Sequence, residues 1–157
     1  MKNYPLLFTY RDVVQGKGFT SQVAGHGFVL LSIEPDEGFW MYGVIPGAIA
    51  AFGATPDEAH TSFRIAYREI INQIAEESSD FADFRSKAET FFTETNTPNR
   101  ADWDEALALV RANNVTVEGL EKKPADSPSF HATVIDPRFQ SACPPQFSSD
   151  PLKALAA

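Results

Sequence analysis

The first half of the chain alternates short β-forming runs with tight turns, and this alternation restricts the fold more than any other feature. Gly27–Glu34 and Phe39–Val44 are separated by Pro35–Gly38, which has proline and aspartate early and glycine last, as β-turns do. Pro46–Gly47 predicts a second turn, and Ala48–Phe52 is the third run. Three strands joined in this way predict an antiparallel meander, which needs a partner to cover its apolar face.

An amphipathic helix with a strong start signal follows the meander directly. Thr55 suits the N-cap, Pro56 suits the first helical position, and Glu58 completes a capping box. Apolar residues then recur with a 3.6-residue period at Ala59, Phe63, Ala66, Ile70 and Ile74. We therefore expect a long helix that begins at Thr55, ends near Ser78 and packs across the meander.

Further elements are predicted on both sides of this unit. Helical spacing predicts two additional helices, Asp80–Thr93 with Ser79 as its cap, and Arg100–Asn113. The proline-containing segment Asn96–Asn99 predicts the break between them. The β-forming runs outside the meander are Leu6–Val14, Phe19–Ala24, Val115–Leu120 and His131–Ile135. The first two of these runs are expected to pair as a short hairpin.

The fold class predicted from these elements is α+β, an antiparallel β-meander packed on a long helix, with two additional helices. The length of 157 residues fits one domain. We place a single α+β domain at residues 1–136, with a helical insertion at about 80–113, and an extended C-terminal tail at 137–157. The 43% of hydrophobic residues can build a core without disulfide bonds or bound metal.

Charge and cysteine content restrict the partners and the compartment. The formal net charge of −8 disfavours direct nucleic acid binding, which needs clustered Lys and Arg, and it allows a basic protein partner. The single cysteine, Cys143, cannot form an internal disulfide, which is typical of a reducing compartment. No run approaches the ~20 apolar residues of a membrane span, and the N-terminal apolar run is too short for a signal peptide. We expect a cytoplasmic protein that does not bind membranes.

The sequence contains no recognisable catalytic or metal-binding motif. His26, His60 and His131 have no further His or Cys at ligand spacing, and no GxSxG or phosphate-binding glycine motif occurs. Most carboxylates fall in turns or in first turns of helices, where capping and the helix dipole explain them. We therefore expect no enzyme activity, no cofactor and no metal, and we predict no catalytic, cofactor-binding or metal-binding residue.

Short motifs follow one another in a set order through the meander and into the helix: Phe28–Ile33, Asp36–Gly38, Phe39–Met41, Pro46–Gly47, Gly53–Thr55 and Asp57–Ala59. In this order, the segment at about 27–77 resembles the N-terminal domain of the HicB family of antitoxins. The chain departs from the family pattern at Val44-Ile45, where the family often has an aspartate, and at Ala48, where the family has a cysteine.

The resemblance implies a partial RNase H-like fold without catalytic acids and a non-enzymatic domain that binds proteins. In the family the partner is a small basic toxin that cleaves RNA, so an antitoxin-like role in a toxin–antitoxin system is the implied function. The acidic charge of this chain fits such a partner. Exposed edges of a short sheet also favour a homo-oligomer. The tail at 137–157 has neither basic character nor a helix pair, so no DNA binding is expected.

A second hypothesis is a small-molecule-binding sensor or enzyme, with its pocket between the sheet and the inserted helices. The aromatic residues near that place, which are our candidates for a pocket or a partner surface, are Trp40, Tyr42, Phe84 and Trp103. The simplest interpretation of these side chains is plain core, because large aromatic residues dominate protein cores.

Overall fold

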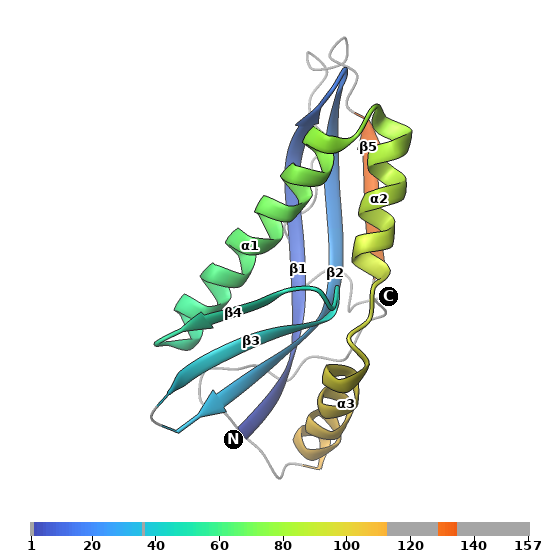
Figure 1. Ribbon diagram of the computed structural model, residues 1–157. Helices are drawn as coiled ribbons and strands as arrows, with labels where there is room; N and C mark the ends of the chain where they lie inside the picture. Colours follow the sequence, from blue (N-terminus) through green and yellow to red (C-terminus); the bar gives the residue numbers. More distant parts are fainter. Residues whose placement is uncertain (1, 36, 113–128, 135–157) are drawn as a thin grey trace, which may run out of the picture.

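The computed structural model describes residues 2–35, 37–112 and 129–134, and in this part the architecture is α+β (Figure 1). A long hairpin comes first, followed by two short strands, three helices and one more strand. Their bounds are β1 Lys2–Gly16, β2 Phe19–Glu34, β3 Gly38–Ile45, β4 Ala50–Gly53, α1 Pro56–Glu77, α2 Phe81–Thr93, α3 Thr97–Arg111 and β5 Ser129–Val134. The candidates at 115–120 and in the tail lie outside the described residues.

The hairpin of β1 and β2 is the longest feature of the sheet. The two strands pair antiparallel from Lys2 with Ile33 to Gly16 with Phe19. Gly18, in the connecting turn, has φ of +74°, a conformation that glycine adopts without steric cost. The predicted pairing of 19–24 with β1 is confirmed, but the arm is not short, because β2 continues through the glycines up to Glu34. Gly27 does not end a strand: a Cβ there would lie 1.8 Å from the carbonyl oxygen of Ile45, so the glycine permits a close backbone approach.

The second edge of β2 is shared between two strands. β3 pairs with Phe28–Glu34 and β5 pairs with Ser21–His26, both antiparallel, while β4 pairs with the far edge of β3. The β2–β3 register shifts between Phe28 and Val29, which is a bulge that increases local twist. Figure 1 shows β3 and β4 turned away from the long axis of the hairpin. The meander and the strand predicted at 131–135 are confirmed over the described residues.

Helix α1 begins and ends as predicted. The Thr55 side chain accepts a hydrogen bond from the Glu58 backbone N–H at 3.2 Å, and Glu58 accepts one from the Ala54 N–H at 2.9 Å. Ser78 is the C-cap. The buried face is rotated from the predicted one and consists of Ala59, Phe63, Tyr67, Ile71 and Ala75. Ala66, Ile70 and Ile74 lie at its margin, because the Tyr67 ring takes the central place beside Tyr10, at 4.3 Å between ring centroids.

The largest core cluster lies between α1, α2 and one face of the hairpin, which we call the inner face. Phe8 and Val23 contribute from the strands, Phe63 from α1 and Phe84 from α2. Helix α2 begins one residue later than predicted, with Asp80 as its N-cap in place of Ser79. The reason is that the Asp80 carboxylate accepts from the Asp83 N–H at 2.9 Å, and an ionised acceptor is the stronger one.

Helix α3 covers part of the opposite face, which we call the outer face. Phe28, Leu30 and Val44 form a second cluster there with Trp103 and Ala106. The predicted break between the two helices is present but lies at 94–96 rather than at 96–99. Asn96 is the N-cap of α3, and Pro98 lies in the first turn, where its missing N–H costs nothing. The backbone anchors this start, since the Asn96 N–H donates to the Val44 carbonyl at 3.1 Å and Gly47 N–H donates to Glu94 at 2.8 Å.

We expect Phe63→Ala to lower the free energy of unfolding by about 3–5 kcal/mol, because it opens a cavity in the inner-face cluster. Ile65→Ala is the matched control on the same helix, where the side chain is 52% exposed, and should change stability by less than about 0.5 kcal/mol. Urea unfolding of both variants measures the difference. Equal losses would contradict the packing of α1 through Phe63.

Candidate functional site

The four aromatic residues predicted as a pocket or partner surface lie in different places. Phe84 is fully buried in the inner-face cluster, and Trp103 is buried in the outer-face cluster, stacked on Phe28 at 4.4 Å between ring centroids. Tyr42 packs at the margin of the outer-face cluster, and Trp40 stacks on Tyr42 at 5.8 Å with an angle of 10° between the rings. The fold thus brings Trp40, Tyr42 and the Trp103 cluster together on one face and leaves Phe84 on the other.

Phe52 extends the row of aromatic rings on the outer face. It pairs with Trp40 in the β3–β4 register, and the two ring centroids lie 5.3 Å apart. Trp40 and Tyr42 are half-buried, while Phe52 is 44% exposed. We call Tyr42, Trp40 and Phe52 the aromatic ladder. Sequence reasoning did not single out Phe52, because only the pairing of β4 with β3 shows which ring it meets.

Two glycines allow the ladder to lie where it does. Gly38 has φ of +109°, and a Cβ there would lie 2.9 Å from the Phe52 ring, so glycine is needed both for the turn and for the ring above it. At Gly53 a Cβ would lie 2.2 Å from the Ala59 nitrogen, so β4 runs directly against the start of α1. This contact places Asp57 and Glu58 together with Phe52 around one shallow pocket.

Carboxylates flank the ladder at both ends. Glu34 follows Leu30 and Ser32 along the outer face of β2, and its hydrogen bond with Glu37 and the negative charge of Glu37 raise its pKa. The pKa of the Tyr42 hydroxyl is raised by burial and by the negative charge of Glu34, which shows that this carboxylate lies near the ladder. Asp57 and Glu58 supply negative charge at the Phe52 end.

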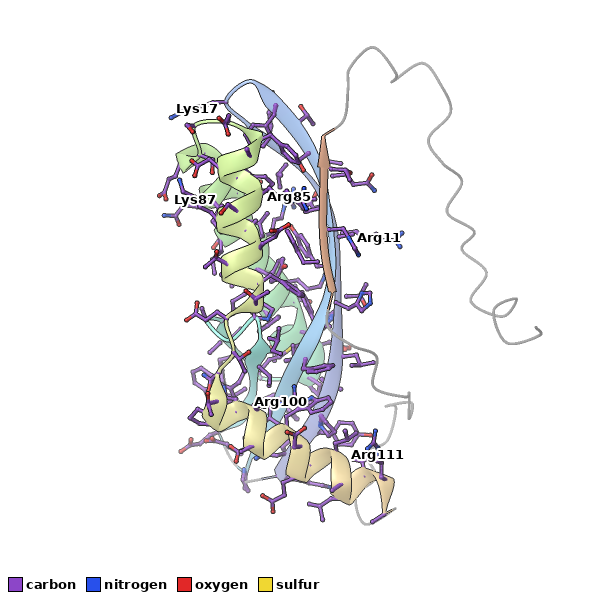
Figure 2. The ribbon with its side chains drawn as sticks, turned by 90° about the vertical axis from the view of Figure 1, so that its right-hand side faces the viewer. Arg11, Lys17, Arg85, Lys87, Arg100 and Arg111 are labelled. Atoms are coloured by element: carbon purple, nitrogen blue, oxygen red, sulfur yellow. The ribbon has the colours of Figure 1, made fainter. Side chains whose placement is uncertain are left out.

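A hollow of about 480 Å³ lies on the outer face of the upper hairpin, and we call it the open-face pocket. Its lining residues are Leu7, Thr9, Tyr10, Arg11, Gln22, Ala24, Gly25, His26, Gly27, Phe28, His131 and Thr133. They come from β1, β2 and β5. Figure 2 shows Arg11 pointing away from the helices, on the side of the sheet opposite to Arg85 and Lys87. One sequence signal bears on this pocket, because the period-2 alternation of β1 and β2 places Arg11 and His26 on one face. The pairing of β5 with β2, which only the structure shows, adds His131.

Within residues 2–35, 37–112 and 129–134, no group of three His, Cys, Asp or Glu side chains is placed to hold a metal ion. Over the same residues, no helix is long and apolar enough to cross a membrane. No family model, curated protein or solved structure matches the chain. The resemblance to the HicB family therefore stays a prediction.

The two tryptophans should differ in exposure to solvent, and this difference is testable. In Trp103→Phe the remaining Trp40 lies on the ladder and should be quenched readily by acrylamide, whereas in Trp40→Phe the remaining Trp103, only 3% exposed, should be protected. Fluorescence quenching of the two single-tryptophan variants measures this. Equal quenching would contradict the exposed position of the ladder.

Proposed function

We infer that this protein is a non-enzymatic, HicB-like protein-binding domain whose aromatic ladder docks a small basic protein. The observation that carries the proposal is the ladder itself, three neighbouring and incompletely buried rings with carboxylates at both ends. A stacked Trp and Tyr are the residue types that most often dominate binding energy at protein interfaces.

The chemistry of the ladder favours a cationic partner. The face of a Trp ring attracts Lys and Arg side chains, and this attraction is worth about 0.5–1 kcal/mol at exposed sites and more where water is excluded. Glu34 and Glu37 share a hydrogen bond that raises the pKa of Glu34, and a partner's positive charge beside them would favour the ionised form of both groups. The net charge of −8 adds a long-range field that speeds the approach of a basic protein.

The segment that carries the HicB resemblance is also the segment that carries the ladder. Trp40 belongs to the aromatic strand of the family pattern, and Asp57 and Glu58 belong to the helix start. We therefore propose an antitoxin-like role, in which the ladder covers a small basic RNA-cleaving toxin. A partial RNase H-like fold without catalytic acids is part of this proposal.

Assembly of several copies is the second part of the proposal. Within the described residues β1 pairs with β2 alone, so its other edge faces no strand. Leu7 and Val13 are exposed on this strand, and unpaired edges readily accept a further strand. Arg64 donates to the Thr9 carbonyl at 2.9 Å, and Arg68 pairs with Asp12 at 3.2 Å. Side chains of α1 therefore already contact the middle of β1.

Co-purification from the native cell, with mass determination of the complex, tests both parts. The full chain is compared with a ladder variant, Trp40→Ser with Phe52→Ser, and with a control, Ile65→Ser with Leu109→Ser, which changes exposed apolar residues of α1 and α3. We expect wild type and control to retain one small basic protein, and the ladder variant to bind it at least about 30-fold more weakly, as for the loss of an interface hot spot.

Two outcomes would contradict the proposal. One is the absence of any basic protein from the wild-type complex, and the other is equal retention by the ladder variant. The mass of the wild-type complex also gives the number of copies, and a single copy would contradict assembly through β1.

A second prediction concerns the rate of binding to that partner. Glu34→Gln with Glu37→Gln should lower the association rate and its dependence on salt, because charges at the margin of an interface act mainly on the encounter. Glu69→Gln with Glu76→Gln is the control, since it removes the same charge from exposed positions of α1. Stopped-flow association at two salt concentrations measures the effect. Equal rates for the two variants would show that the carboxylates near the ladder have no special role.

A further inference from the structure

We propose that the open-face pocket binds a small organic anion, a carboxylate or phosphate group attached to an apolar body. This site is separate from the ladder and does not depend on the proposed function. Three features of the pocket carry the inference, namely its charge, the order of its side chains along the strands, and a firmly packed apolar end.

The charge of the pocket is opposite to that of the whole chain. The protein has 21 Asp and Glu against 13 Lys and Arg, yet the pocket lining contains Arg11, His26 and His131 and no carboxylate. The nearest acid along β1 is Asp12, which alternation directs to the inner face. There it accepts a hydrogen bond from the Tyr10 hydroxyl at 3.0 Å and pairs with Arg68 at 3.2 Å.

The side chains are ordered from apolar to basic along the hairpin. Leu7 pairs with Phe28 at one end, Thr9 pairs with His26 next, and Arg11, Ala24 and His131 form the following row across three strands. Rows on one face of a strand lie about 7 Å apart. The small Ala24 side chain, between Arg11 and His131, makes the hollow in which an anionic group can reach both.

The apolar end of the pocket is fixed by packing against α3. The Phe28 ring stacks on Trp103 of α3 with centroids 4.4 Å apart, and the Trp103 indole N–H donates to the Leu6 carbonyl at 3.3 Å. A ring packed in this way offers a fixed wall, which limits the entropy lost on binding. An apolar body of about 7 Å spans from this wall to the row of His26.

The same side chains argue against other ligands. Arg11 is the one permanently charged group of the lining, and binding of a nucleic acid backbone needs many such contacts. Guanidinium and imidazole groups suit carboxylate and phosphate oxygens, and the hydroxyl and amide groups of Thr9, Gln22 and Thr133 can donate further hydrogen bonds. A small anion with an apolar part matches this combination of an apolar wall and basic groups.

Nuclear magnetic resonance of the histidine rings tests the proposal on the full chain. The protein has three histidines, two of which line the pocket, while His60 lies on α1 and serves as an internal reference. Single His→Gln variants assign the signals. We expect phenyl phosphate or benzoate to shift the signals of His26 and His131 and to leave His60 unchanged. Inorganic phosphate should require at least about ten times the concentration, and neutral benzyl alcohol should have no effect.

Substitution of the arginine separates a specific site from general attraction. Arg11→Met should weaken binding of the aromatic anion at least about tenfold, the effect of losing one charge-assisted hydrogen bond. Lys17→Met, in the hairpin turn and outside the pocket, removes the same charge and should leave the affinity unchanged. Circular dichroism and the unfolding midpoint of each variant show whether the fold is kept.

Several results would overturn the proposal. These are no shift of His26 and His131 with either aromatic anion, shifts that include His60 equally, an equal effect of benzyl alcohol, and equal weakening by Arg11→Met and Lys17→Met. Equal affinity for inorganic phosphate would overturn the apolar part of the ligand. If Arg11→Met loses its fold, His131→Gln in the exposed strand β5 replaces it, with the same expected direction.

Discussion

Strand β2 is the constraint on which the rest of the structure depends. It pairs with β1 along one edge, while β3 and β5 divide the other edge between them. From Gly27 to Ser32 every residue of β2 is buried, with Val29 in the core cluster of α1 and α2, and Phe28 and Leu30 in the cluster of α3. A strand held in this way cannot slip by one residue, because a slip would exchange the residues of the two cores. The register of β2 therefore sets the position of every other element.

The three helices cover the sheet unequally, and this inequality produces both candidate sites. α1 and α2 cover the inner face of the hairpin, whereas α3 packs on Phe28 and Leu30 of the outer face and, through Val110, on Tyr4 and Leu31. The aromatic ladder lies beyond α3 on β3 and β4, and the open-face pocket lies beyond it on β1, β2 and β5. The stack of Phe28 on Trp103 contacts both sites. Phe28 lines the open-face pocket, and Tyr42 of the aromatic ladder packs against the cluster of these two rings.

The two sites have opposite electrostatic character on one face of one sheet. Carboxylates flank the aromatic ladder, and the hydrogen bond with Glu37, together with the charge of Glu37, raises the pKa of Glu34. The open-face pocket has only basic ionisable side chains apart from Tyr10. Salt screens interactions between exposed charges over about 8–10 Å, so each site keeps its own character despite the acidic net charge.

Local signals in the sequence determined the elements of this protein. The turn at Pro35–Gly38, the capping of α1 by Thr55 and the apolar period of the helices act within a few residues, and the strands and helices follow from them. The errors come from residues that have two uses. A glycine inside β2 indicates a strand end in the sequence, but Gly27 permits a close approach of the distant Ile45 backbone. A proline indicates part of a break, but Pro98 lies in the first turn of α3, where proline is tolerated.

Only the tertiary structure decided which side chains meet. Phe52 joins Trp40 through the pairing of β4 with β3, and His131 joins Arg11 because β5 returns to β2 over more than a hundred residues. It also separated Phe84 from the other aromatic candidates by placing them on opposite faces of the sheet. Contacts of this kind depend on register and on which helix covers which face, and these are set by the packing of the whole sheet rather than by any short stretch of sequence.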